Sequence, residues 1–180
     1  MALPEIQSHG QYQAESPEKT AGEIMKPLEY FSSVSDDTTV KNAIFLLMNS
    51  LNLENIATHL LVFESKTLIG IVGMHELISA MEPPGIRDHW YRGWNVSSWS
   101  KPVFLQGLFT NRCMVLSEKA VRDIIQPITS TINESGSLME AIYQFSKNGR
   151  DALPVVSNGL VIGILRRCDL VAEIHRILGA

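Results

Sequence analysis

Helix-like and strand-like patterns of apolar residues occur twice along this chain, in the same order. In 39–47 and 137–145, apolar side chains recur at intervals of three and four residues, which is the spacing of one helical face. Two short apolar runs with a turn between them follow each of these segments and indicate a β-hairpin. The runs lie at 60–63 and 68–72 in the first copy and at 153–156 and 161–165 in the second.

Polar residues and glycine mark the ends of these elements. Ser137 with Glu140 three residues later predicts a capping box at the start of the second copy's helix, and Thr39 is the matching N-cap in the first. Gly149 suits the left-handed position that ends a helix. The Asn-Gly dipeptide at 158–159 favours a tight hairpin turn, because both residue types reach positive φ easily.

Each copy also begins and ends with a matching segment. Residues 24–28 (Ile-Met-Lys-Pro-Leu) return as 124–128 (Ile-Ile-Gln-Pro-Ile), and a second amphipathic helix closes each copy. In the later copy, the apolar stripe of this helix comprises Leu170, Ile174, Ile177 and Leu178. The repeating unit is therefore strand, helix, strand, strand, helix. Two such units predict an α/β fold in which the repeats pack about a pseudo-two-fold axis.

The repeat divides the chain into four predicted regions. Residues 1–23 are rich in Gln, Glu, Ser and Gly and have no apolar period, so we assign them to a disordered tail. The first repeat takes 24–81, and the second takes 122–180. Between them, 82–121 forms an aromatic-rich helical insertion.

The insertion has the least ordinary composition. Its aromatic residues crowd together before Pro102, which is placed to open a helix. They are Trp90, Tyr91, Trp94 and Trp99, and the predicted helix carries Phe104, Leu105, Leu108, Phe109 and Leu116. Aromatic rings among arginines can stack on single-stranded nucleic acid, but a net charge of −4 gives this chain no cationic field. We therefore interpret the insertion as a local core or a subunit interface.

Composition narrows the class of protein further. Hydrophobic residues make up 45% and charged residues 19%, as in an ordinary globular protein. No apolar stretch approaches the ~18 residues that a membrane span requires, and no secretory signal opens the chain. The two cysteines lack zinc-ligand spacing, so we expect no metal site and a reducing, cytoplasmic location. No nucleophile and base pair or phosphate loop can be assembled, so we expect no catalytic residues and no required cofactor.

The two hairpin-to-helix junctions carry a resemblance to a known family. Residues 152–156 read Ala-Leu-Pro-Val-Val, and 163–170 read Gly-Ile-Leu-Arg-Arg-Cys-Asp-Leu. The earlier copy is a looser version, with His-Leu-Leu-Val-Phe at 59–63 and Gly-Ile-Val-Gly-Met-His-Glu-Leu at 70–77. In this order and in tandem, they resemble a pair of CBS domains, also called a Bateman module. The resemblance covers roughly 24–81 and 122–178.

The resemblance implies a non-catalytic regulatory module that senses an adenosine-containing ligand in the cleft between its repeats. The ligand class includes AMP, ADP, ATP, NAD and S-adenosylmethionine. Related pairs accompany inosine monophosphate dehydrogenases, chloride channels and the gamma subunit of AMP-activated kinase. Such a module acts on a regulated partner protein, which the sequence does not identify. Related modules also associate through their amphipathic helices, so we expect a homodimer.

The same resemblance implies a set of ligand-binding residues in each repeat. A carboxylate at the start of a helix, held by free amides, can accept hydrogen bonds from both ribose hydroxyls. Asp169 matches that position, and Glu76 is its longer counterpart. The adenine edge would meet backbone groups near Thr131, Ala152 and Leu153 in the second repeat, and near Ser33, His59 and Leu60 in the first.

Two positions depart from the family pattern and leave alternatives open. Where many nucleotide-binding members have Thr or Ser, three residues before the acid, this chain has Gly73 and Arg166. Arg166 could bind a phosphate bidentately, and His59 could reach a phosphate or simply pack. Because Asp169 is shorter and has Arg166 nearby, we expect the second-repeat site to be the stronger one. Loss of the Thr or Ser also allows the alternative of a dimerising scaffold without a ligand.

Overall fold

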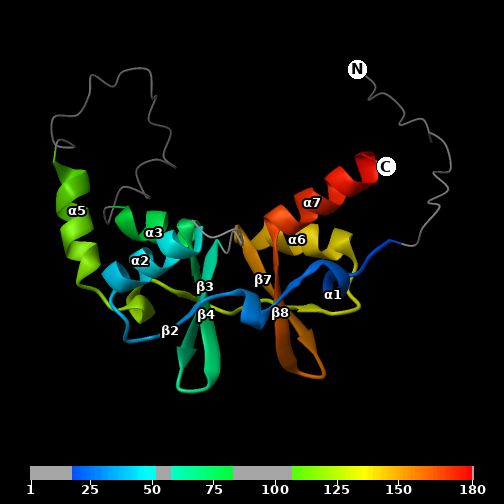
Figure 1. The fold of residues 1–180 in the computed structure, drawn as a ribbon, viewed down its shortest axis with the longest axis horizontal. Coiled ribbons are helices and arrows are strands. Elements are labelled where there is room, and N and C mark those ends of the chain that lie inside the picture. Colours follow the sequence, from blue (N-terminus) through cyan, green and yellow to red (C-terminus); the bar gives the residue numbers. More distant parts are fainter. Residues whose placement is uncertain (1–17, 52–57, 83–106, 180) are drawn as a thin grey trace, which may run out of the picture.

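The computed structural model describes residues 18–51, 58–82 and 107–179. Two β-hairpins stand side by side, and the helices cluster at one end of them (Figure 1). The first-repeat elements are β2 (Ser33–Ser35), α2 (Val40–Leu51), β3 (His59–Glu64), β4 (Thr67–Gly73) and α3 (Met74–Met81). The second-repeat elements are β6 (Ile132–Asn133), α6 (Leu138–Asn148), β7 (Ala152–Ser157), β8 (Leu160–Arg166) and α7 (Arg167–Leu178). The predicted strand, helix, strand, strand, helix order is therefore confirmed in both copies.

The signals at the element ends act as predicted, except that the Ser137 contact is one half of the predicted capping box and the return bond from the Glu140 side chain is not made. The Ser137 hydroxyl accepts a hydrogen bond from the Glu140 amide at 3.1 Å, and the Thr39 hydroxyl accepts one from the Asn42 amide at 3.3 Å. Gly149 ends α6 with a φ of 63°. The second hairpin turns through Asn158 and Gly159, with φ values of 49° and 79°. These local choices fix where each helix and hairpin stops.

The segments that begin the two repeats exchange places between sheets. Strand β1 (Lys26–Pro27) pairs antiparallel with β8 of the second repeat, with Lys26 opposite Ile164. Strand β5 (Gln126–Pro127) pairs in the same way with β4 of the first repeat, with Pro127 opposite Gly70. The two four-stranded sheets have the orders β1-β8-β7-β6 and β2-β3-β4-β5. Each repeat therefore completes the sheet of the other.

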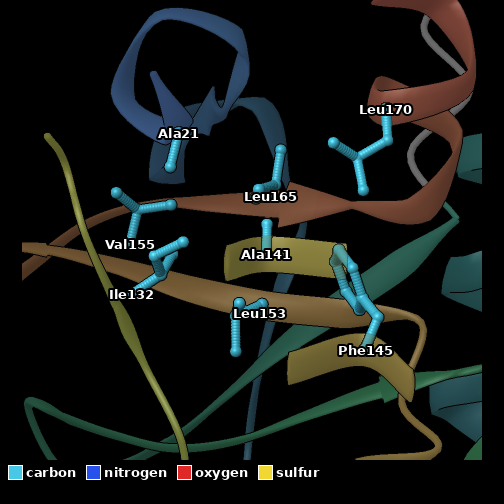
Figure 2. Close-up of a cluster of buried hydrophobic side chains, with 8 residues drawn as sticks. All are labelled: Ala21, Ile132, Ala141, Phe145, Leu153, Val155, Leu165 and Leu170. Atoms are coloured by element: carbon cyan, nitrogen blue, oxygen red, sulfur yellow. The ribbon is translucent and has the colours of Figure 1, made fainter. Parts of the chain in front are cut away.

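Three clusters of buried side chains hold the fold together. The second-repeat core, drawn in Figure 2, comprises Ala21, Ile132, Ala141, Phe145, Leu153, Val155, Leu165 and Leu170. The first-repeat core comprises Ala43, Leu47, Leu60, Val62, Val72 and Val121. A central cluster joins the repeats and comprises Phe31, Leu61, Ala152 and Ile164. Because this third cluster draws on both hairpins, burial of apolar area couples the two repeats.

The prediction that the disordered tail extends to residue 23 is wrong at its end. Residues 21–24 form helix α1 (Ala21–Ile24), which lies beside the second repeat in Figure 1, and the Ala21 side chain is fully buried in the second-repeat core. The Lys19 ammonium lies 2.9 Å from the Glu173 carboxylate of α7. Hydrogen bonds from Arg176 and Lys19 lower the pKa of Glu173 to about 2. Residues 1–17 lie outside the described part.

The described part of the insertion contains one helix, α5 (Leu108–Ser117), which follows Gly107. The Arg112 guanidinium donates to the carbonyl oxygens of Ala80 and Glu82 at the end of α3, and so ties α5 to the first repeat. Leu116 is buried, whereas Phe109 is exposed. The predicted helix start at Pro102, the residues Phe104 and Leu105, and the cluster of aromatic residues lie outside the described residues.

Candidate functional site

The two predicted ribose-binding carboxylates occupy equivalent positions, each at the start of the helix that follows a hairpin. Glu76 Oε2 accepts a hydrogen bond from the Gly73 amide at 2.9 Å, and Asp169 Oδ2 accepts one from the Arg166 amide at 2.9 Å. Their exposed fractions are 8% and 7%. Each carboxylate therefore satisfies a free amide at its helix start, as its sequence position predicted.

The residues beside these carboxylates are complementary in size between the two repeats. His59 lies opposite Gly73 in the first hairpin, and Ala152 lies opposite Arg166 in the second. A Cβ atom on Gly73 would lie only 2.6 Å from the His59 ring, so the imidazole fills the space that a side chain there would need. Each repeat therefore places one basic side chain at this cross-strand pair, but on opposite strands.

Arg166 binds Asp169 rather than extending away from it. Its Nε lies 2.9 Å from Asp169 Oδ2, and its Nη2 lies 2.6 Å from Oδ1, so the guanidinium meets both carboxylate oxygens. The guanidinium carbon lies 5.1 Å from the Tyr30 ring centre and 5.7 Å from that of Phe31. Burial alone would lower the pKa of Arg166, but the hydrogen bond and charge of Asp169 raise it above its usual value. This pair is neutral overall and shielded by aromatic rings.

His59 is buried close to the charged groups of both repeats. Its Nδ1 lies 2.8 Å from the Thr58 hydroxyl oxygen. Burial lowers the pKa of His59 below its usual value, and the Glu76 carboxylate only partly offsets this effect. The charges of Arg166 and Asp169 also act on the His59 ring. His59 is therefore neutral at neutral pH. Of the two roles that the sequence left open for His59, the structure shows packing, because the ring fills the space beside Gly73.

The predicted adenine-binding positions offer mainly backbone groups. The Leu60 side chain is buried in the first-repeat core, and the Leu153 side chain is buried in the second-repeat core. Ala152 belongs to the central cluster, at the junction of the two repeats. Ser33 and Thr131 are both exposed, beside β3 and before β6 respectively. A ligand at these positions would therefore meet peptide groups and small side chains.

Sequence reasoning missed the aromatic pair Tyr30 and Phe31, whose rings lie against Arg166. It also missed Asp151, which lies just before β7 and whose charge acts on the His59 ring. Tyr30 and Phe31 follow the first short strand and lack a spacing pattern. The only available signal was their adjacency to the repeated Pro-containing segment.

Other site types find no support within the described residues. No group of three or more His, Cys, Asp or Glu side chains in the described ranges is arranged to hold a metal ion. In the same ranges, no helix is both long enough and apolar enough to cross a membrane.

The comparison with protein families decides the identity of the repeats. The CBS domain model matches residues 21–83 and 121–176, which together are more than half of the chain. This chain belongs to the CBS domain family. The match has the same two-copy arrangement as the structure, in which each CBS domain supplies one hairpin and one carboxylate-bearing helix.

Solved CBS-pair structures share this fold. CBSX2 in complex with AMP is 25% identical, with a TM-score of 0.58, and the match covers 89% of this chain and 98% of that one. A second structure of CBSX2, from Arabidopsis thaliana, is also 25% identical, with a TM-score of 0.57 over 91% of this chain and 99% of that one. The cytosolic domain of the magnesium channel MgtE in complex with ATP is 19% identical, with a TM-score of 0.53, and covers 89% of this chain and 50% of that one. Among curated proteins, the comparison finds no match.

Proposed function

We propose that this chain is a non-catalytic regulatory protein whose two CBS domains, over 24–81 and 122–180, bind an adenosine-containing ligand between them. The observation that carries the proposal is the pair of buried carboxylates, Glu76 and Asp169, each held at a helix start beside the junction of the repeats. A similar protein, CBSX2, has been crystallised with AMP. Carboxylates in this position suit the two hydroxyls of a ribose.

Sensing requires that the ligand bind two arrangements of the repeats unequally. The proposed contacts are at least one of the two carboxylates and the segments around Ser33, His59, Leu60, Thr131, Ala152 and Leu153. These contacts come from both repeats, whose hairpins meet in the central cluster. A ligand there would change how tightly the repeats pack, and a partner protein that contacts both repeats would respond to the change.

Calorimetry of the purified protein tests the proposal. We expect AMP, ADP, ATP, NAD or S-adenosylmethionine to bind with a saturable heat, and guanosine and cytidine nucleotides to bind at least tenfold more weakly. Guanosine and cytidine nucleotides control for binding through phosphate alone. An absence of saturable heat with all five adenosine compounds would contradict the proposal.

The second candidate function is a dimerising scaffold without a ligand. The observation that favours it is the Arg166–Asp169 pair, because this internal guanidinium already occupies the second-repeat carboxylate. The same calorimetry separates the two functions, since a scaffold gives no heat with any nucleotide but still associates with itself.

In either case we propose a homodimer in a cytoplasmic setting, which suits the free cysteines Cys113 and Cys168. The helices of both repeats carry exposed apolar side chains that packing within one chain leaves uncovered. They include Phe45 and Met48 on α2, Ile78 on α3, and Ile174 and Ile177 on α7. An apolar face of this kind is typical of a protein interface.

Light scattering tests the homodimer. We expect a mass of twice the 20.0 kDa chain at tens of micromolar protein. The double variant Ile78→Glu/Ile174→Glu should reduce the mass to that of one chain, because the new charges would be buried in the interface. Its circular dichroism spectrum should stay that of the wild type. A wild-type mass of one chain across the concentration range would refute the homodimer.

A further inference from the structure

The two half-sites of the proposed ligand site differ in how their carboxylates are already used. In the second repeat, Arg166 meets both oxygens of Asp169, and each side chain of this pair is only 6% exposed. In the first repeat, the residue equivalent to Arg166 is Gly73, which has no side chain. Glu76 Oε2 accepts a hydrogen bond from the Gly73 amide. The other carboxylate oxygen, Oε1, has no hydrogen-bond partner among the described residues.

The surrounding charges increase this difference. Asp169 is neutralised by a guanidinium that cannot lose its proton in the protein. Glu76 lies near His59, whose lowered pKa keeps the imidazole neutral at neutral pH. No ion pair joins Glu76 to a cation within 18–51, 58–82 and 107–179, and a buried carboxylate of this kind gains more from new hydrogen-bond donors than one that is already paired.

On this basis we propose that Arg166 blocks the second-repeat half-site and that Glu76, rather than Asp169, binds the ribose hydroxyls of the ligand. This inference rests on the proposed function and reverses the preference for the second repeat that the sequence suggested. Hydroxyls that approached Asp169 would have to displace a bidentate, charge-assisted pair. Hydroxyls that approach Glu76 displace no protein group that the described residues supply.

The test measures the binding of AMP and of 2′-deoxy-AMP by calorimetry to the wild type and to three variants, the third of which is Arg166→Thr alone. Glu76→Gln keeps an acceptor for the Gly73 amide but removes the charge. Arg166→Thr/Asp169→Asn removes both members of the pair together, so that neither charge is left buried alone. Thermal unfolding of all three variants checks that they fold.

We expect Glu76→Gln to weaken AMP binding by about ten- to a hundredfold, the range for loss of charge-assisted hydrogen bonds. The wild type should prefer AMP to 2′-deoxy-AMP, and Glu76→Gln should abolish that preference, which a purely structural role for Glu76 would leave intact. The paired variant should bind AMP within about threefold of the wild type. The single variant Arg166→Thr should bind a second equivalent of AMP per chain, because it frees Asp169.

Loss of AMP binding in the paired variant, with Glu76→Gln unchanged, would overturn this assignment but keep the proposed function. Binding that appears only in Arg166→Thr would also overturn the assignment to Glu76. If neither the wild type nor Arg166→Thr bound any of the five adenosine compounds, the proposed function itself would be wrong, and the assignment with it.

Discussion

The substitution Ala21→Asp is expected to destabilise the protein by about 4 kcal/mol, because it places a carboxylate in a core without a partner. The Ala21 side chain is fully buried and packs with Ile132, Val155 and Leu165 in the second-repeat core (Figure 2). The ion pair of this segment, Lys19 with Glu173, is already satisfied, and its Glu173 side chain is only 6% exposed. Urea unfolding followed by circular dichroism measures the loss.

The matched control is Ala172→Asp, the same substitution at an exposed position of α7. It should change the free energy of unfolding by less than about 1 kcal/mol, since it costs only helix propensity. Equal effects of the two variants would show that residues 18–24 contribute little to stability, and would support the tail boundary that the sequence predicted.

The repeated pattern of the sequence predicted most of the fold because its signals are local. The apolar run at 153–156 became β7 (Ala152–Ser157), and the caps at Ser137 and Gly149 bound α6 as expected. The exchange of β1 and β5 between sheets was not predictable. A strand of two residues is too short to show an alternating apolar pattern, so the sequence does not indicate which strand it pairs with. Helix α1 was missed for a related reason: four residues are too few to display a helical period.

The candidate site divides in the same way between local and long-range information. Asp169 and Glu76 were placed correctly at helix starts, because the hairpin and the helix that define those positions are adjacent in sequence. The orientation of Arg166 could not be predicted, since residues three apart at a helix start can either pair or point apart. The rings of Tyr30 and Phe31 that lie against the guanidinium come from the first repeat, so only the tertiary fold brings them there.

The exchanged strands also make Gly163 a position where one methyl group should matter. A Cβ atom at Gly163 would lie 2.5 Å from Met25 Sδ and 2.6 Å from the Lys26 carbonyl oxygen. The sulfur can move, but the carbonyl belongs to β1, which pairs with β8 at this point. Gly163→Ala is therefore expected to destabilise the protein by about 2–3 kcal/mol, through a forced shift of β1 away from β8.

Urea unfolding measures this loss, and hydrogen exchange locates it: the Lys26 amide, which is the one N–H group of β1 because Pro27 has none, should exchange faster than in the wild type, whereas the amides of β7 should not. The control is Leu160→Ala, at an exposed position of the same strand, where we expect a change within about 0.5 kcal/mol. Because β1 carries the chain from the first repeat onto the sheet of the second, a weaker β1 should also loosen the docking of the Tyr30–Phe31 pair on Arg166. Wild-type stability and exchange in Gly163→Ala would mean that the contact between β1 and β8 is not close enough to connect the repeats.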